Sequence, residues 1–127
     1  MNKVEKKYYI QASISQVFEA LTSVEKIEEW SGASAKMEIA AEGEFALWDG
    51  TIHGINKEVS DTKIVQLWKE ANWDTYSHCV FTLKEQGQST ELWLLHTDIP
   101  QSSVKSIDKG WDEYYLGPLK EMLENQH

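Results

Sequence analysis

Cysteine is almost absent from this sequence: Cys79 is the only one, so no disulfide can form within the chain. A lone cysteine in a strand-like segment suits a reducing compartment, and we expect a cytoplasmic location. Long apolar runs are absent too, since none approaches the roughly 20 residues that span a bilayer. The polar opening segment, residues 2–7, has no features of a secretory or transit peptide. We therefore expect no membrane partner.

Positive charge is scarce: 12 lysine and arginine residues stand against 21 aspartate and glutamate residues, which gives a net charge of −9. Such a chain is repelled by the phosphates of nucleic acids and by anionic membranes, so neither is expected as a partner. A charged binding face would instead favour basic partners. The length of 127 residues predicts a single domain over residues 1–127, large enough to bury roughly two-thirds of its unfolded surface.

Motifs of catalysis and metal binding are also missing. The sequence has no nucleophile elbow, no phosphate-binding glycine loop, no His-Glu-x-x-His and no Cys-x-x-Cys. His96 shares one face of a predicted strand with Leu92 and Leu94. A histidine there is either a general base inside a cavity or a hydrogen-bonded structural residue, and the structural role is the preferred interpretation. We predict no catalytic residues, no metal site and no cofactor, and hence a protein that is not an enzyme.

Aromatic residues, in contrast, are abundant, with six tryptophans, five tyrosines and three phenylalanines. The simplest explanation is a sheet that packs against a helix through aromatic side chains, because these side chains dominate core energetics. A cavity lined for an apolar ligand is the alternative explanation.

The first part of the chain predicts a strand and two short helices. Residues 4–12 alternate between apolar and polar side chains, as in a half-buried strand. Ser13 and Gln16 then have the spacing of a capping box, which opens an amphipathic helix. Thr22 and Glu25 repeat that spacing and predict a second capping box at the start of another short helix.

The middle of the chain predicts six further strands, each ending at a turn signal. Their ranges are 36–41, 44–48, 51–59, 63–70, 76–85 and 90–98. Connections this short make neighbouring strands antiparallel. Asp49 and Gly50 supply the positive φ angles of a type I′ hairpin turn. One face of the last two strands is predicted to be covered, and its members are Cys79, Phe81, Leu83, Leu92, Leu94 and His96.

The covering element is predicted near the end of the chain, from residue 102 to about residue 124. Apolar residues recur there every three or four positions, as on one face of a long helix. Pro118 has no N–H for the carbonyl of Tyr114, so we expect a kink at Gly117–Pro118. The resulting α+β fold class is a helix-grip fold. It has an antiparallel sheet of about six or seven strands wrapped around a long C-terminal helix, with two short helices after the first strand.

Three segments, residues 43–54, 64–69 and 110–115, carry a family signature in their order and spacing. Together with Ile99-Pro100, its most specific pieces are Leu47-Trp48-Asp49-Gly50, Ile64-Val65-x-x-Trp68 with Trp73 following, and Gly110-Trp111-x-x-Tyr114-Tyr115. The combination resembles the C-terminal domain of the activators of the heat-shock protein 90 ATPase, within the helix-grip (START-like, SRPBCC) superfamily. The resemblance implies the same fold and a domain that docks near the nucleotide-binding domains of the chaperone. It covers the second domain of the two-domain activators and not the first, which in the family carries the main chaperone-binding determinants.

Three functions stay open at this point. The first is a stand-alone, monomeric module that binds a heat-shock protein 90 type chaperone as a co-chaperone. The second is an SRPBCC-type binder or carrier of a small hydrophobic ligand in the helix–sheet cavity, and the third is an enzyme of the cyclase or hydratase kind. A cavity of several hundred cubic ångströms would favour the second. The predicted cavity residues are Trp48, Trp68, Phe81, Leu83, Leu92, Leu94, His96, Trp111 and Tyr115, with His96 as the polar contact.

Overall fold

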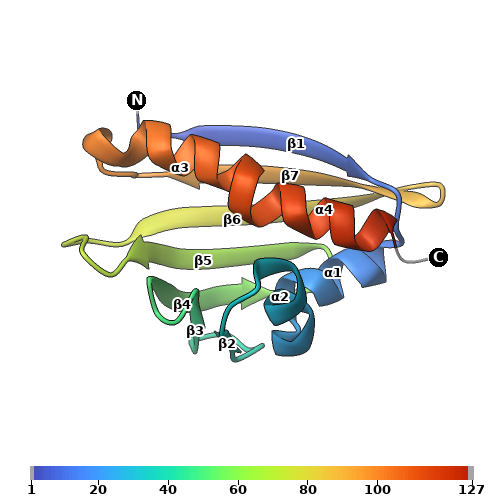
Figure 1. The fold of residues 1–127 in the computed structure, drawn as a ribbon, viewed down its shortest axis with the longest axis horizontal. Coiled ribbons are helices and arrows are strands. Elements are labelled where there is room, and N and C mark those ends of the chain that lie inside the picture. The colour runs from blue at the N-terminus through green and yellow to red at the C-terminus, as the bar shows by residue number, and fades with distance from the viewer. Residues whose placement is uncertain (1, 126–127) are drawn as a thin grey trace.

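A seven-stranded antiparallel sheet forms the framework of the computed structural model, which describes residues 2–125 (Figure 1). Its strands are β1 (Val4–Ile10), β2 (Lys36–Met37), β3 (Gly43–Leu47), β4 (Ile52–Val59), β5 (Lys63–Glu70), β6 (Ser77–Gln86) and β7 (Ser89–Thr97). Their order across the sheet is β1-β7-β6-β5-β4-β3-β2, so all neighbours except β1 and β7 are consecutive in the chain. The predicted antiparallel sheet is confirmed.

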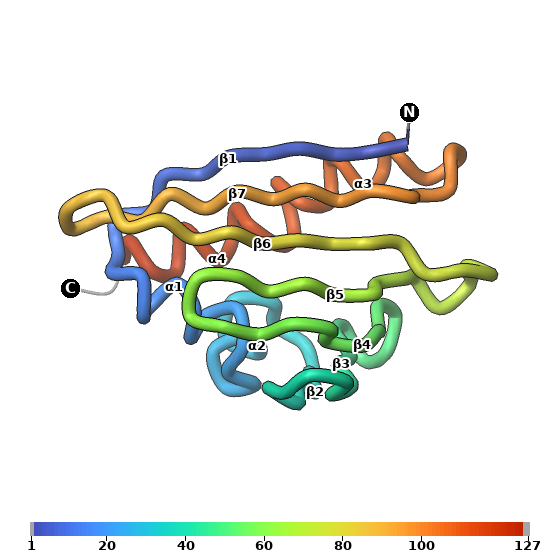
Figure 2. Tube along the Cα trace, turned by 180° about the vertical axis from the view of Figure 1, so that it is seen from behind, coloured from blue at the N-terminus to red at the C-terminus, as the bar shows by residue number. Residues whose placement is uncertain are grey.

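The helices lie on one face of this sheet. Their bounds are α1 (Ile14–Thr22), α2 (Val24–Ser31), a 3₁₀ turn (Gln101–Ser103), α3 (Val104–Gly110), a π-helical turn (Trp111–Tyr115) and α4 (Leu116–Glu124). Figure 1 shows α3 and α4 as one long helix that crosses the sheet, with α1 and α2 beside α4. From behind, the described part of the chain places no helix over the other face (Figure 2). The predicted helix-grip fold is confirmed.

The capping box predicted at the start of α1 is confirmed. The backbone N–H of Gln16 donates to Ser13 Oγ at 3.2 Å, and the backbone N–H of Ser13 donates to Gln16 Oε1 at 2.9 Å. The first backbone N–H groups of a helix, including that of Gln16, have no hydrogen-bond partner inside the helix, and Ser13 provides one for Gln16. The preceding strand ends at Ile10 rather than Ala12. It is shorter than predicted because the chain already turns there, with the Ala12 N–H donating to the Ile10 carbonyl at 2.8 Å.

The second predicted capping box, Thr22 with Glu25, is wrong by one position. Thr22 is the last residue of α1, and its hydroxyl donates to the carbonyl oxygen of Phe18 at 2.8 Å. Ser23 caps α2 instead and accepts a hydrogen bond from the backbone N–H of Lys26 at 3.4 Å. Spacing alone does not separate Thr22 from Ser23, because both residue types are favoured helix caps.

The strand predicted over residues 36–41 is much shorter, because β2 is only two residues long. A tight turn follows it, in which the N–H of Ala40 donates to the carbonyl of Glu38 at 2.9 Å. The Glu38 side chain also accepts a hydrogen bond from the backbone N–H of Glu44 at 2.8 Å. The carbonyl of Glu38 and the N–H of Glu44 are thus bonded within the turn. They are not available for further pairing between β2 and β3, so the hydrogen bonds between these two strands end here.

The hairpin turn predicted between β3 and β4 is confirmed. Asp49 (φ 57°) and Gly50 (φ 93°) both have positive φ angles, and the N–H of Thr51 donates to the carbonyl of Trp48 at 3.1 Å. Trp48 also has a positive φ angle, of 50°, which is rare for a bulky residue. Such strain persists where surrounding contacts hold the residue. Here the Trp48 ring packs edge-on against Trp30, with centroids 6.0 Å apart.

The C-terminal helix is interrupted, although not where the sequence predicts. The interruption is the π-helical turn, in which the N–H of Leu116 donates to the carbonyl of Trp111, five residues earlier. Gly117 lies against this turn, since a Cβ atom on it would be 2.0 Å from the carbonyl oxygen of Asp112. The kink expected at Gly117–Pro118 is therefore a widened turn just before these residues, and only glycine fits at position 117.

Candidate functional site

A pocket lies between the C-terminal helix and the part of the sheet formed by the β3–β4 turn, β4 and β5. Its volume is about 430 Å³, within the range of small-molecule sites, and it is partly open to solvent. The sheet side contributes Trp48, Thr51, Ile52, Trp68 and Glu70, and the helix side contributes Ser106, Ile107, Gly110, Trp111, Tyr114 and Tyr115. Four of the nine predicted cavity residues line this pocket: Trp48, Trp68, Trp111 and Tyr115.

The other five predicted cavity residues do not line it. They are Phe81, Leu83, Leu92, Leu94 and His96, all buried on β6 and β7. The ring of Phe81 contacts those of Trp111 and Tyr115, with centroids 5.7 and 6.0 Å away. The helix therefore fills the space above β6 and β7 with its own side chains. As a correction, these five residues belong to the packed core, and the open space lies over β4 and β5.

Aromatic rings form a continuous wall of the pocket. Trp68 stacks on Trp111 with ring centroids 5.6 Å apart, Trp111 contacts Tyr115 at 4.5 Å, and Tyr115 contacts Trp48 at 5.8 Å. These rings come from the three segments that carry the sequence signature. Segments that are far apart in the chain thus meet at one place, on one side of this pocket.

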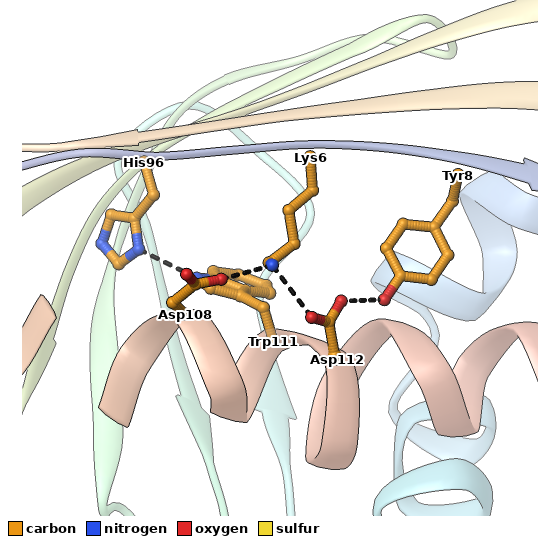
Figure 3. Close-up of polar contacts among 6 residues, drawn as sticks. All are labelled: Lys6, Tyr8, His96, Asp108, Trp111 and Asp112. Atoms are coloured by element: carbon orange, nitrogen blue, oxygen red, sulfur yellow. Dashed lines mark hydrogen bonds and ion pairs between the residues drawn. The ribbon is translucent and has the colours of Figure 1, made fainter. Parts of the chain in front are cut away.

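His96 holds the centre of a buried hydrogen-bond chain next to that wall. The indole N–H of Trp111 donates to His96 Nδ1 at 3.0 Å, so the imidazole proton is assigned to Nε2 (Figure 3). The Nε2 atom then donates to Ser77 Oγ at 2.7 Å, and the Ser77 hydroxyl donates to the carbonyl of Trp68 at 2.5 Å. Burial lowers the pKa of His96 to about 3, so the ring is neutral at neutral pH.

The Ser77–His96 pair resembles a nucleophile beside a base, but its surroundings give it a structural role. Both residues are fully buried. The serine proton is donated to a backbone carbonyl and not to the imidazole. Both nitrogens of His96 are occupied by protein groups, so neither is free for a ligand oxygen. Within residues 2–125, moreover, no group of three or more His, Cys, Asp or Glu side chains is arranged to hold a metal ion.

A polar cluster that was not predicted from the sequence connects β1 to the C-terminal helix. It consists of Lys6, Tyr8, Asp108 and Asp112 and is called the Lys6 cluster below. Lys6 Nζ contacts Asp108, and it contacts Asp112 Oδ2 at 2.9 Å; the Tyr8 hydroxyl donates to Asp112 (Figure 3). The sequence pattern that indicates this cluster is a lysine on the same face of the strand as Val4, Tyr8 and Ile10. A charged residue on an inward face requires a partner on the element that covers it.

The contacts of the Lys6 cluster change three pKa values. Partial burial alone would lower the pKa of Lys6, but hydrogen bonds to Asp108 and Asp112 raise it. Partial burial would likewise raise the pKa of Asp112, but hydrogen bonds from Tyr8 and Lys6 lower it. Burial, together with the bond to Asp112, raises the pKa of Tyr8 well above its ordinary value. At neutral pH the cluster is therefore a charged lysine, a charged Asp112 and a neutral tyrosine.

The family model described as Activator of Hsp90 ATPase homolog 1-like protein matches residues 11–124. The chain belongs to this family. The match contains every residue that lines the pocket, together with α1 and α2. Family membership therefore applies to the whole candidate site and not to a fragment of it.

The chain is also similar to curated proteins described as activators of the 90 kDa heat shock protein ATPase. The Activator of 90 kDa heat shock protein ATPase homolog of Dictyostelium discoideum is 27% identical over 118 residues, which make up 90% of this chain and 31% of that protein. The chain spans about a third of the length of the curated relatives it matches. The likeness thus concerns one part of those proteins.

Solved structures share the fold. An HSP90 activator from Plasmodium falciparum superposes with a TM-score of 0.92 at 25% identity, covering 97% of this chain and 96% of that one. A protein from the dynemicin biosynthetic locus reaches a TM-score of 0.84 at 18% identity, covering 98% of this chain and 48% of that one. The second likeness concerns the fold alone. No helix within residues 2–125 is both long and apolar enough to cross a membrane.

Proposed function

We propose that this chain is a cytoplasmic, monomeric binding module that acts on a heat-shock protein 90 type chaperone as a co-chaperone. The observation that carries this proposal is the family match over residues 11–124, which takes in almost the whole domain. The fold match to the HSP90 activator of Plasmodium falciparum, which covers nearly all of both chains, also supports it.

The uncovered face of the sheet is the surface that we assign to the chaperone. On β1 and β7 it exposes Tyr9, Trp93 and Leu95, with 52, 45 and 38% of their surfaces accessible. Lys7 lies over the Trp93 ring, 4.6 Å from its centroid. Exposed aromatic side chains that gather on one face are typical of protein interaction sites.

A titration of the isotope-labelled chain with the cognate chaperone tests this proposal. We expect backbone amide shifts around Trp93, a Kd in the micromolar range because one small domain offers a single contact surface, and a changed rate of ATP hydrolysis by the chaperone. Trp93→Ser should weaken binding at least tenfold. Tyr114→Ser is the matched control, because Tyr114 is another exposed aromatic residue but lies on the helix side. An unperturbed spectrum at millimolar chaperone would refute the proposal.

A second candidate function is the binding of a small hydrophobic ligand, and the pocket of about 430 Å³ favours it. Most of its lining is aromatic or aliphatic, which suits an apolar molecule. An apolar ligand that fits should raise Tm by mass action and change tryptophan fluorescence, because Trp48, Trp68 and Trp111 line the space. A screen of fatty acids, sterols and aromatic polyketides that leaves both readouts unchanged would count against this candidate.

Gly110→Leu provides the pocket-specific control for that screen. Gly110 lines the pocket on the helix side, and a Cβ atom on it would meet only Tyr114 Cδ2, at 4.0 Å. A leucine there thus has room and would occupy part of the pocket. Ligand binding should be lost in this variant while the fold is retained, as judged by an unchanged or raised Tm in the absence of ligand.

A further inference from the structure

Among the described residues that line the pocket, Glu70 is the one with a carboxylate side chain. It follows Trp68 by two positions on β5, so both side chains lie on the face of the sheet that the helix covers. Glu70 is half-buried, and its carboxylate has no hydrogen bond or ion pair within residues 2–125. A carboxylate that is partly removed from water and unpaired favours a positive partner.

No side chain within residues 2–125 supplies that positive partner. Of the described residues that line the pocket, none is a lysine or a histidine. The adjacent Lys69 lies on the opposite face of β5, and its Nζ donates to the carbonyl of Trp73 at 2.8 Å. Lys109, next to the lining residue Gly110, contacts Glu113 at 3.8 Å. Lys69 and Lys109 are thus engaged elsewhere, and within residues 2–125 no basic side chain is paired with Glu70.

The rest of the pocket has the chemistry that accepts an organic cation. Five of its lining residues are tryptophan or tyrosine, and the faces of these rings attract cations through their quadrupoles. The same rings offer apolar surface to the hydrocarbon part of a ligand. The net charge of −9 adds a long-range attraction for cations. Aromatic walls together with one carboxylate therefore favour a molecule that is apolar over most of its surface and positive at one end.

We propose that the pocket binds a small organic ammonium ion, whose hydrocarbon part lies against the Trp48–Tyr115–Trp111–Trp68 wall while its cationic group lies beside Glu70. This inference rests on the second candidate function, a ligand-binding pocket, and names the class of ligand. A neutral apolar ligand of the same shape leaves the Glu70 carboxylate desolvated without a partner, and an anion is repelled by it. Charge, and not only shape, thus determines which ligand is preferred.

Three probes of matched size test the role of charge: benzyltrimethylammonium, its neutral carbon isostere neopentylbenzene, and the anion phenylmethanesulfonate. Tryptophan fluorescence and Tm are followed for the full chain in about 150 mM salt, which screens attraction from distant surface charges. We expect the cation to bind about tenfold more tightly than the neutral isostere, and the anion to bind most weakly.

Two variants test whether Glu70 is the source of the preference for the cation over the neutral isostere. Glu70→Gln keeps the shape of the side chain and should reduce the preference for the cation to about twofold or less. Part of this change should be tighter binding of neopentylbenzene, which no longer desolvates an unpaired carboxylate. Glu85→Gln removes an exposed carboxylate of β6 that does not line the pocket, and it should keep the preference. A preference that stays near tenfold in Glu70→Gln overturns the proposal. So does binding of the cation that survives in Gly110→Leu, because it places the cation outside the pocket.

The outcomes separate this inference from the ligand-binding function on which it rests. If neopentylbenzene binds as tightly as benzyltrimethylammonium, the pocket is a ligand site but the assignment of a cation is wrong. If none of the three probes changes Tm or fluorescence, and the wider apolar screen is also silent, the ligand-binding function fails and this inference fails with it.

Discussion

The imidazole of His96 has no place for an additional proton in the folded chain. Trp111 donates to one nitrogen, and the other donates to Ser77 in a fully buried site. The pKa of His96 is lowered to about 3 from 6.5 by burial. Between these two values the unfolded chain binds a proton that the folded chain excludes, so folding stability falls as the pH falls through this window.

This residue predicts an acid sensitivity that can be measured. Between pH 7 and pH 5, His96 alone should remove about 2 kcal/mol from the free energy of unfolding in urea titrations. His96→Gln keeps an acceptor and a donor but does not titrate, so its stability should change much less over the same range. Parallel pH curves for the two proteins would contradict this account of His96.

At the scale of one element, the C-terminal helix contains two glycines with opposite requirements. Gly110 has helical backbone angles and open space around its Cβ direction, whereas a Cβ atom on Gly117 would collide with the carbonyl oxygen of Asp112. Gly110→Ala should stabilise the fold by about 0.5–1 kcal/mol, because it reduces the entropy of the unfolded chain. Gly117→Ala should destabilise it by about 2–3 kcal/mol. Urea unfolding of both variants checks this, and a shift of the same sign in both would count against the geometry of the π-helical turn.

The Lys6 cluster fastens the same helix to β1 and has its own pH dependence. The lowered pKa of Asp112 means that this carboxylate stabilises the fold above its ordinary pKa, and that the contribution is lost as the pH falls through the lowered value. Because Asp112 is about half exposed, the contribution is small. Asp112→Asn should cost less than about 1 kcal/mol at pH 7, and the gap to the unsubstituted chain should shrink below about pH 4. A gap of equal size at pH 7 and pH 3 would mean that the charge of Asp112 is not what matters.

For the whole molecule, we propose that the two faces of the sheet have separate binding functions. The covered face contains the pocket, and the uncovered face exposes Trp93 and its neighbours. We expect Trp93→Ser to weaken chaperone binding and leave the binding of benzyltrimethylammonium unchanged, and Gly110→Leu to do the reverse. Calorimetric titrations of both variants with both partners check this. Loss of both activities in either variant would show that the faces are coupled.

The sheet was predictable from sequence, because strand alternation and short turns are local. The ranges of β4 to β7 lie within about one residue of the predicted ones, and Asp49–Gly50 defines its turn through backbone angles alone. Which inward-facing residues belong to the packed core and which line the pocket was not predictable. Phe81 and Trp68 have the same alternation, but the helix covers one closely and leaves space beside the other. That difference depends on the path of the helix, which no strand pattern contains. Glu70 was not predicted for another reason: a single carboxylate near the end of a strand has the pattern of a solvent-exposed residue, although the same alternation places Glu70 beside Trp68.

The π-helical turn also sets the angular phase of the C-terminal helix. The buried residues Ile107, Trp111, Tyr115, Leu119 and Leu123 follow one another at intervals of four. In a regular α-helix each interval of four overshoots a full turn by roughly 40°, so the row would wind by roughly 160° from first to last. The widened turn holds one extra residue, which absorbs roughly 100° of that rotation. Both halves of the helix can therefore direct the same row of side chains at a single sheet, and without this correction the last two leucines would rotate away from the core.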